Sequence, residues 1–244
     1  MSSSKSRPEA YTVLYLVSVE QSHNNKLPKE KRFMIIVHHL NNSRSQRVLW
    51  LLEELGIEYE IKFYERDAKT MLAPKSLRQV HPLGKSPVIT DADSTIAESG
   101  AIIEYLIDRY GNGRLIPASD TPEYLRYKYW LHYAEGSAMP LLVMQLVLNN
   151  FGAGDSSVVS GFVAPQIKLH FDYIESELRK NTWFAGEEFT AADIQMSFPL
   201  EVIATQPKEI ESRPKLKEFI DRIHTRPAYK RALERGGKYD FSSQ

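Results

Sequence analysis

The segment His81-Pro82-Leu83-Gly84-Lys85-Ser86-Pro87-Val88 combines a turn, a serine–proline pair and the start of an apolar run. Its Pro and Gly residues favour a turn, and residues 86–90 predict a buried strand directly after it. A cis bond between Ser86 and Pro87 would expose the backbone of Ser86 to a ligand. Because only about 5–6% of bonds before proline are cis, these residues alone favour a trans bond.

The elements upstream of this segment alternate between strand and helix. Residues 34–39 predict a buried strand, and the polar residues 41–45 precede an apolar-periodic helix that Gly56 ends. Residues 59–64 alternate enough to predict a second strand, and residues 74–80 predict a short helix before the turn.

Downstream, a short strand around Thr95 and Ile96 leads into a helix over residues 99–110. The resulting order, strand, helix, strand, helix, strand, strand, helix within about 80 residues, favours a small mixed sheet covered by helices. We therefore predict an α/β, thioredoxin-like N-terminal domain over residues 34–115.

From Thr121 onward the apolar spacing becomes helical. A linker at residues 112–120, rich in Gly, Pro and Ser, marks the boundary, and residues 149–157 predict a polar loop. We expect helices at about 122–148, 162–179, 191–204, 214–225 and 228–235. The C-terminal domain, over residues 121–244, is therefore predicted to be all-α.

The charge balance and the absence of cysteine limit the classes of function that the chain can have. The 244 residues hold 31 Lys plus Arg and 31 Asp plus Glu, so the formal net charge is zero. This balance gives no electrostatic reason to expect nucleic acid or an acidic membrane as partner. The chain has no cysteine, so any thiol must arrive with a ligand. No apolar run approaches the roughly 20 residues that span a bilayer.

Residues 1–33 predict an N-terminal extension, which we expect to be poorly ordered. Its short apolar patch superficially resembles a signal peptide, but it contains Tyr11, Tyr15 and Ser18, and no convincing cleavage pattern follows. We therefore expect a cytoplasmic protein rather than a secreted one.

Four local features follow one another in a specific order. They are Asn42-Ser43-Arg44-Ser45, the turn at residues 81–88, Glu98-Ser99 at a helix start, and Thr190-Ala191-Ala192-Asp193. In this order they resemble cytosolic glutathione transferases from about residue 34 to the end of the chain, most closely a fungal and bacterial branch. The resemblance implies the glutathione-transferase fold, a homodimer, and a cleft that holds glutathione and an apolar electrophile.

The resemblance also implies which residues bind glutathione. Ser86-Pro87 would be cis, with the main chain of Ser86 paired to the cysteinyl part of glutathione. Glu98 would take the γ-glutamyl ammonium and Ser99 the carboxylate, at a helix N-terminus that favours anions. Lys85 matches a position that reaches the glycyl carboxylate. The residues alone allow the alternatives of helix capping at Glu98 and Ser99 and an ordinary exposed lysine.

Activation of the thiol is expected at the start of the helix that follows the first strand. A free thiol with a pKa of about 8.5 is mostly protonated at neutral pH, and a donor at a helix N-terminus lowers that pKa. Ser43 and Asn42 are the predicted catalytic residues, Ser45 is a third choice, and helix capping is the structural alternative. No tyrosine occupies this position, so a tyrosine-type mechanism is not expected.

Three further predictions concern the helical domain and the histidines. Thr190 and Asp193 predict a capping box with a structural role. The aromatic residues of the first long helix favour core packing, and Tyr133 is the residue that we predict for the acceptor site. The seven histidines show no metal-ligand spacing, so we expect no metal.

The predicted activity is that of a glutathione transferase, with glutathione as substrate and a role in detoxification. The same thiolate would also serve a glutathione-dependent peroxidase reaction. The alternative is a non-catalytic glutathione-binding regulator or assembly module of the same fold, because a fold does not determine a function. A glutathione-dependent lyase or dehalogenase would differ only in its acceptor pocket.

Overall fold

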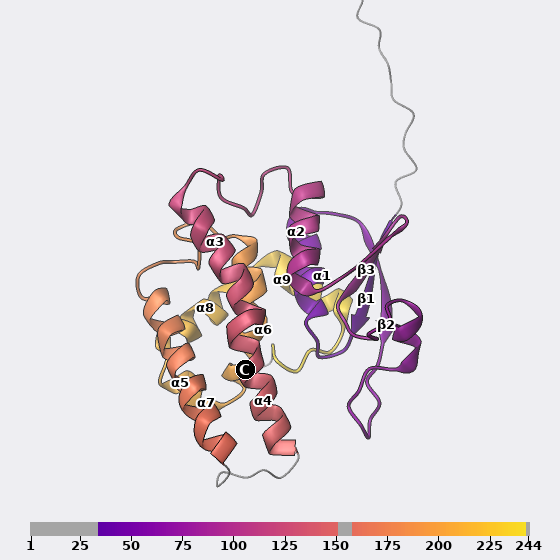
Figure 1. Cartoon of the computed structure of the whole chain (residues 1–244). Helices are drawn as coiled ribbons and strands as arrows, with labels where there is room; N and C mark the ends of the chain where they lie inside the picture. Colours follow the sequence, from indigo (N-terminus) through magenta and orange to yellow (C-terminus); the bar gives the residue numbers. More distant parts are fainter. Residues whose placement is uncertain (1–33, 151–157, 243–244) are drawn as a thin grey trace, which may run out of the picture. The chain divides into compact units, whose positions relative to one another are not determined.

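The computed structural model describes residues 34–150 and 158–242 (Figure 1). The extension predicted for residues 1–33 and most of the loop predicted for residues 149–157 lie outside the described residues. The described chain belongs to one compact unit. The predicted domain boundary between residues 115 and 121 stays a prediction.

A four-stranded mixed sheet, with strand order β2-β1-β3-β4, forms the N-terminal part of the fold. β1 (Ile35–Leu40) runs parallel to β2 (Tyr59–Tyr64) and antiparallel to β3 (Val88–Asp91). β3 pairs antiparallel with β4 (Ser94–Ala97). The parallel pair requires a crossover connection, which a helix between β1 and β2 supplies. The sheet confirms the predicted thioredoxin-like arrangement.

Three helical segments connect these strands or follow them. α1 (Ser45–Leu55) ends at Gly56, whose φ of 64° lies in the left-handed region that favours glycine. Residues Lys75–Gln79 form a short 3-10 helix, η1, and α2 (Ser99–Tyr110) follows the sheet. All three lie close to their predicted positions because their apolar spacing and their end signals are local.

The bond between Ser86 and Pro87 is cis, as the resemblance implies and in contrast to the trans bond that the residues alone favour. β3 begins at Val88, later than the predicted residue 86. Proline has no N–H to donate to a strand ladder, which accounts for the later start.

In the described residues the C-terminal part is all-α. Its helices are α3 (Pro122–Tyr133), α4 (Met139–Asn150), α5 (Val158–Leu178), α6 (Ala191–Ala204), α7 (Pro207–Glu211), α8 (Pro214–His224) and α9 (Pro227–Gly236). The helix predicted over residues 122–148 is interrupted by a π-helical turn at Ala134–Ala138, and α7 was not predicted. No helix of the described residues is long and apolar enough to cross a membrane.

One apolar core joins the sheet part and the helical part. α1 packs against β1, α2, α6 and α9, and Figure 1 shows α9 beside α1 although the two are far apart in the sequence. Trp50 of α1 contacts Phe189 and Tyr229, with ring centroids 5.6 and 5.1 Å apart. Gly236 permits the close approach, because a Cβ there would lie 2.8 Å from the Gln46 side chain.

The central helix of this core is α6, and 13 of its 14 residues are buried. The predicted capping box is present at its start: one oxygen of Asp193 accepts the N–H of Thr190 at 2.8 Å. The other oxygen accepts the N–H of Phe184, also at 2.8 Å. Burial raises the pKa of Asp193 to about 6, although these hydrogen bonds lower it. The box therefore fixes the start of a helix that later contributes to the site.

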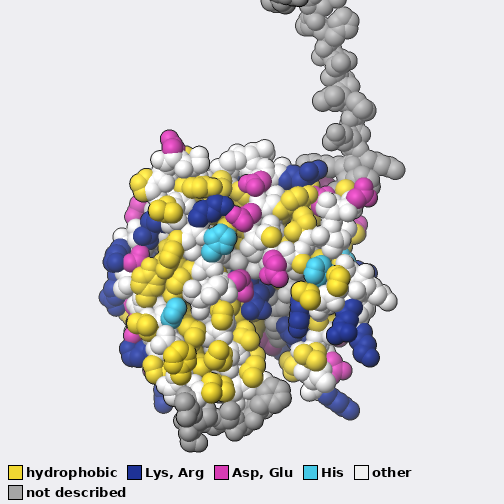
Figure 2. Space-filling model, in the orientation of Figure 1, with side chains coloured by type: hydrophobic (Ala, Val, Ile, Leu, Met, Phe, Trp, Pro, Cys, Tyr) yellow, Lys and Arg dark blue, Asp and Glu magenta, His cyan; other side chains and the backbone are white. Residues whose placement is uncertain are grey.

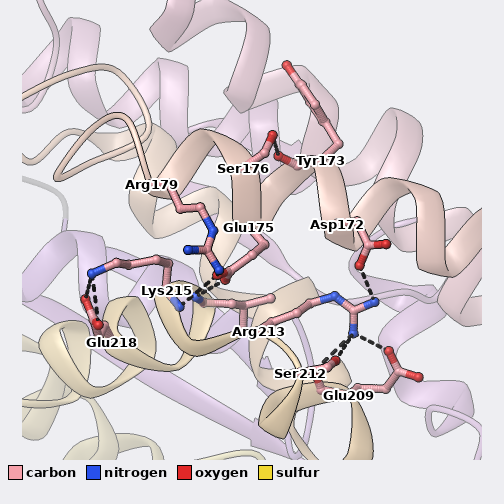
Figure 3. Close-up of polar contacts among 11 residues, drawn as sticks. Asp172, Tyr173, Glu175, Ser176, Arg179, Glu209, Ser212, Arg213, Lys215 and Glu218 are labelled. Carbon is pink, nitrogen blue, oxygen red and sulfur yellow. Dashed lines mark hydrogen bonds and ion pairs between the residues drawn. The ribbon is translucent and has the colours of Figure 1, made fainter.

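A cluster of ion pairs holds α5, α7 and α8 together (Figure 3). Arg213 is only 3% exposed and donates to Asp172 at 2.9 Å, and it also pairs with Glu209. Glu175 accepts the N–H of Leu216 at 2.9 Å in the first turn of α8. Because the first N–H groups of a helix have no partner within it, this carboxylate caps α8.

Candidate active site

A turn between β1 and α1 carries the first group of predicted site residues. Asn42 has a φ of 47°, a left-handed conformation that asparagine tolerates better than most residues. Arg66 braces this turn by donating to the carbonyl oxygens of Asn41 and Asn42, both at 3.2 Å. The start of α1 therefore has a defined shape.

A series of hydroxyl groups runs from this turn to the cis bond. The Oγ of Ser43 lies 2.7 Å from the Oγ of Ser45 and 3.5 Å from the Oγ of Ser86. Ser43 also accepts the N–H of Ser45 at 3.2 Å, and Ser86 donates to the carbonyl of His38 at 2.9 Å. The fold thus brings together two predicted site residues from different segments, Ser43 and Ser86.

The inner end of this series is a neutral histidine. The Oγ of Ser45 lies 2.9 Å from Nδ1 of His39 and 3.3 Å from the carbonyl oxygen of Leu40, two acceptors for its one hydrogen. Burial lowers the pKa of His39 to about 4, although a hydrogen bond to the backbone of Gly236 raises it. Ser45 has no exposed surface, so it is the least accessible of the three predicted activators.

The hydroxyl oxygen of Ser99, at the start of α2, is occupied by two donors. It accepts Nη2 of Arg47 at 3.1 Å and Nε2 of Gln195 at 3.2 Å. A hydroxyl has two acceptor positions and one hydrogen, so the hydrogen of Ser99 is left to donate. At a helix N-terminus, such a donor suits a carboxylate. The preceding residue, Glu98, has a φ of 70° and an exposed side chain.

In the sequence, Lys85 comes directly before the cis bond, and β3 follows that bond. It is exposed and lines a cavity of about 410 Å³ together with Leu72, Arg78 and Gly84. This cavity shares no lining residue with the one beside Asn42 described below. Two of the predicted site residues, Lys85 and Asn42, therefore line different cavities.

The side chain of Asn42 is held by the C-terminal segment. Its Nδ2 donates to the carboxylate of Asp240 at 2.7 Å, and its Oδ1 accepts the N–H of Asp240 at 2.9 Å. Hydrogen bonds from Lys238 and Asn42 lower the pKa of Asp240. One N–H of the Asn42 amide remains for another acceptor. Asn42 is thus directed toward Asp240, whereas Ser43 is directed toward Ser86.

Two arginines at the start of α1 share one glutamate of the π turn. Glu135 accepts Nε of Arg44 at 2.9 Å and also pairs with Arg47. Burial alone raises the pKa of Glu135, but the charges and hydrogen bonds of the two arginines outweigh burial and lower it. Arg47 is 1% exposed, and burial lowers its pKa. One carboxylate for two guanidinium groups leaves an excess of positive charge.

A cavity of about 580 Å³ opens beside Asn42 and Arg44. Its apolar wall comes mainly from α4, α6 and the C-terminal segment. The apolar residues that line it are Met71, Met139, Leu142, Val143, Leu146, Phe198, Val202 and Phe241. Ser43, whose hydroxyl group approaches Ser86, lies between Asn42 and Arg44 in the chain but does not itself line the cavity.

Tyr133, the residue predicted for the acceptor site, lies elsewhere. It is 8% exposed, its hydroxyl lies 2.7 Å from Nδ1 of His170, and its ring packs against Tyr129 and Tyr173. It does not line the cavity beside Asn42. Burial raises its pKa above the usual value. Its acceptor role stays a prediction.

Sequence reasoning missed the residues that orient the others. Arg47 and Gln195 orient Ser99, and Asp240 holds Asn42. For Arg47 and Gln195 the available signal was a polar residue within an apolar helix, because buried polar groups require partners. Within residues 34–150 and 158–242, no three His, Asp or Glu side chains are grouped so that they could hold a metal ion.

Two family models match the chain. The model described as "Glutathione S-transferase, N-terminal domain" matches residues 33–108, and "Glutathione S-transferase, C-terminal domain" matches residues 163–227. The first match includes the turn before α1, the cis bond and the start of α2. The second includes α6 and α8.

Similar proteins come from fungi and bacteria. Glutathione S-transferase 3 of Schizosaccharomyces pombe is 38% identical over 217 residues, which cover 83% of this chain and 88% of the relative. Glutathione S-transferase 1 of Saccharomyces cerevisiae is 30% identical over 223 residues, covering 83% and 95%. The structure of a glutathione S-transferase from Actinobacillus pleuropneumoniae has a TM-score of 0.78 at 38% identity, covering 86% of this chain and 97% of its own. A glutathione transferase of Phanerochaete chrysosporium, solved with oxidized glutathione, has a TM-score of 0.70 at 25% identity, covering 85% and 97%.

Proposed function

The chain belongs to the glutathione S-transferase family, and from this premise we propose that Ser43 activates the thiol of bound glutathione for attack on electrophilic small molecules. Glutathione is the substrate, as it is for the family. The observation that carries the assignment of Ser43 is the 3.5 Å distance between its Oγ and that of Ser86. If the main chain of Ser86 pairs with the cysteinyl residue, the sulfur lies next to the Ser43 hydroxyl.

When glutathione binds, Ser43 turns its single hydroxyl hydrogen from the Oγ of Ser45, 2.7 Å away, to the thiolate. Its oxygen still accepts the N–H of Ser45, which orients the hydroxyl group. The N-terminus of α1 and the excess positive charge of Arg44 and Arg47 further favour the ionised sulfur. Asn42 is the second choice as donor, because Asp240 already occupies its carbonyl oxygen and one of its N–H groups.

The remaining glutathione contacts follow from the same arrangement. Ser99 donates its free hydrogen to the γ-glutamyl carboxylate, while Arg47 and Gln195 hold its oxygen. Glu98 takes the ammonium group, Pro87 keeps Ser86 in place, and Lys85 reaches the glycyl carboxylate. These contacts are charge-assisted, so they are stronger than neutral hydrogen bonds.

Two reactions are open to the thiolate. In conjugation the sulfur forms a bond to an electrophilic carbon, and a leaving group departs or a double bond takes up the electron pair. With an organic hydroperoxide, the sulfur attacks the terminal oxygen and releases an alkoxide, and a second glutathione then yields the disulfide and water. We include both, acting in detoxification in the cytoplasm, with an apolar electrophile in the cavity beside Asn42.

The test is a calorimetric titration with glutathione, followed by the absorbance of the bound thiolate between about pH 5 and 9. We expect a bound-thiol pKa at least about one unit below the free value of about 8.5. Ser43→Ala should return most of that shift and lower kcat/KM by about 10- to 100-fold, whereas Asn42→Ala should have a smaller effect.

Three results would contradict this proposal or its assignment of Ser43. Binding with an unshifted thiol pKa would favour the alternative, a non-catalytic glutathione-binding protein of the same fold. If glutathione does not bind, the proposed function is wrong. A larger effect of Asn42→Ala than of Ser43→Ala would move the activating role to the amide.

We also propose that the protein is a homodimer. Large apolar side chains are exposed on α3 and α5, among them Leu125, Phe162 and Leu169, and Phe63 is exposed on β2. Figure 2 shows hydrophobic side chains gathered over the helices α4 and α5. Exposed apolar patches of this kind mark interaction surfaces. Sedimentation equilibrium should give twice the chain mass at micromolar concentration, and a monomer there would contradict the dimer.

A further inference from the structure

We propose that the cavity beside Asn42 accepts molecules that join an apolar body to an anionic group, and that Arg66 binds the anionic group. The inference rests on the proposed function, because it names the class of electrophile that glutathione attacks in this cavity.

The lining of the cavity is apolar and positively charged. Two of its residues, Arg44 and Arg66, carry a charge, and none is an aspartate or a glutamate. The remaining lining residues are apolar or are the neutral polar residues Asn42, Gln145, Asn149, Asn150, Thr205 and Gln206. An apolar cavity with a few convergent polar groups is typical of a small-molecule site, in which the polar groups set orientation and specificity.

Arg66 has unused donors. Its side chain donates three hydrogen bonds to backbone carbonyl oxygens: Nε to Asn41 at 3.2 Å, Nη1 to Met71 at 3.0 Å and Nη2 to Asn42 at 3.2 Å. A guanidinium group has five N–H donors, so one N–H remains on each terminal nitrogen. Among the described residues no carboxylate pairs with Arg66, whereas Arg44 pairs with Glu135. The backbone contacts therefore hold a charged group in place without neutralising it.

The local charges favour an anion at this point. Arg44 and Arg66 line the same cavity, and burial and the charge of Arg44 both lower the pKa of Arg66. Glu135 and Asp240 both contact lining residues: Glu135 pairs with Arg44, and Asp240 bonds to Asn42 and pairs with Lys238 at 3.1 Å. Asp240 is therefore already partnered. A bound carboxylate would relieve the repulsion between the arginines and take up the unused N–H groups.

The position of the cavity also suits the reaction. Asn42 and Arg44 line it, and Ser43 lies between them in the chain. An electrophile whose anionic group is held by Arg66 lies with its apolar body against α4 and α6, on the side of Phe198 and Leu142. The reactive carbon is then held beside the thiolate that Ser43 is proposed to stabilise, which is the positioning that accelerates a bimolecular step.

The test compares ethacrynate with its methyl ester. Both carry the same electrophilic double bond, and only ethacrynate has a carboxylate, which is remote from the reacting carbon. Arg66→Gln should lower kcat/KM for ethacrynate at least about 10-fold more than for the ester, the effect expected for the loss of a hydrogen bond to a charged group. The readout is the ratio of the two losses of kcat/KM, because Arg66 also braces the turn that carries Asn42 and its replacement can lower both rates.

Two further variants separate charge from bracing. Arg66→Lys keeps the charge and should retain most of the preference for ethacrynate. Lys69→Gln removes one positive charge from the same loop at an exposed residue that does not line the cavity, so it should change the ratio less than about 2-fold.

A second measurement uses the unchanged protein, in case Arg66→Gln folds poorly. Decanoate should inhibit conjugation of the ester at an at least about 10-fold lower concentration than decanamide, and its inhibition should weaken as salt is added. Equal inhibition by the two compounds would overturn the inference. Equal losses of kcat/KM for ethacrynate and its ester in Arg66→Gln would also overturn it. If Arg66→Gln instead raises the Kd for glutathione and leaves the ratio of the two losses unchanged, Arg66 binds the glycyl carboxylate and the inference is wrong. Failure of the proposed function would differ from all of these, since glutathione itself would not bind.

Discussion

Two buried arginines differ in how completely their charge is compensated. Arg213 meets two carboxylates, Asp172 and Glu209, and these three residues form what we call the scaffold cluster. Arg47 meets one carboxylate, Glu135, which it shares with Arg44, and these three form the site cluster. The two arginines are 3% and 1% exposed, so burial does not distinguish them. The scaffold cluster has a surplus of carboxylates and the site cluster a surplus of guanidinium groups.

The difference follows from what each cluster has to do. A buried charge without a partner costs free energy, so a cluster that only joins helices gains from full compensation. A site that binds the carboxylates of glutathione and stabilises a thiolate needs positive charge that the protein itself leaves uncompensated. Under the proposed function, the same residue type is therefore structural between α5, α7 and α8 and serves the site at the start of α1.

The largest expected effect comes from replacing each buried arginine by methionine, which keeps a long apolar stem. Arg47→Met should lower the free energy of unfolding by about 3 kcal/mol, because a buried ion pair loses one partner. It should also raise the Kd for glutathione about 10-fold, because Ser99 loses a donor that orients it. Arg213→Met should cost about 2 kcal/mol of stability and leave the Kd within about 2-fold, because its cluster touches no predicted site residue.

Urea unfolding and calorimetric titration of the two variants measure these effects. The comparison fails if both variants weaken glutathione binding equally, since the two clusters would then not differ in function. It also fails if Arg47→Met changes stability alone.

A smaller effect is expected at His39, a buried histidine that contacts Ser45 near the site cluster. The scaffold cluster contains no histidine. Burial lowers the pKa of His39 from 6.5 to about 4. The unfolded chain therefore binds a proton below pH 6.5 that the folded chain binds only near pH 4. The stability contributed by neutral His39 is fully present above pH 6.5 and is lost as the pH falls from 6.5 to about 4.

We expect this loss to amount to about 3 kcal/mol, since the shift of the pKa from 6.5 to about 4 corresponds to about 1.4 kcal/mol per unit. The measurement is the difference in unfolding free energy between the unchanged protein and His39→Gln across this pH range. His132→Gln, at an exposed position, is the control and should show no such difference. A flat difference curve for His39→Gln would mean that His39 is not held neutral by burial.

The smallest effect is expected at the contact between Asn42 and Asp240, which lies at the surface. Asp240→Ala removes the bond from Nδ2 of Asn42 but keeps the one from the backbone N–H of residue 240. We expect kcat/KM to change less than about 3-fold, as for exposed charged contacts in general. Steady-state kinetics with glutathione and a neutral electrophile measure it. Asp221→Ala, in an exposed ion pair of α8 with Lys217, should have no effect, and a loss above about 10-fold for Asp240→Ala would make Asn42 the main thiol donor.

Some elements were predictable because their signals are local. The apolar spacing of α1, the glycine that ends it, and the alternation in β2 depend on neighbouring residues alone. The π turn at Ala134–Ala138 was not predictable from spacing, since the helical segments on both sides keep their own period. α7 is only five residues long, which is too short for a periodic pattern.

The sequence by itself determined that this chain contains a thioredoxin-like sheet part and a helical part, and that Ser43, Ser86 and Ser99 stand at a helix start, before a proline and at a second helix start. Only the tertiary structure decided that the hydroxyl groups of Ser43 and Ser86 approach each other and that Asn42 is held by Asp240. It also decided that Arg47 and Gln195 occupy the oxygen of Ser99. The physical reason is that hydrogen bonds act over about 3 Å, whereas these partners lie far apart in the sequence. Their meeting depends on how α1, α2 and α6 pack, which no local pattern encodes.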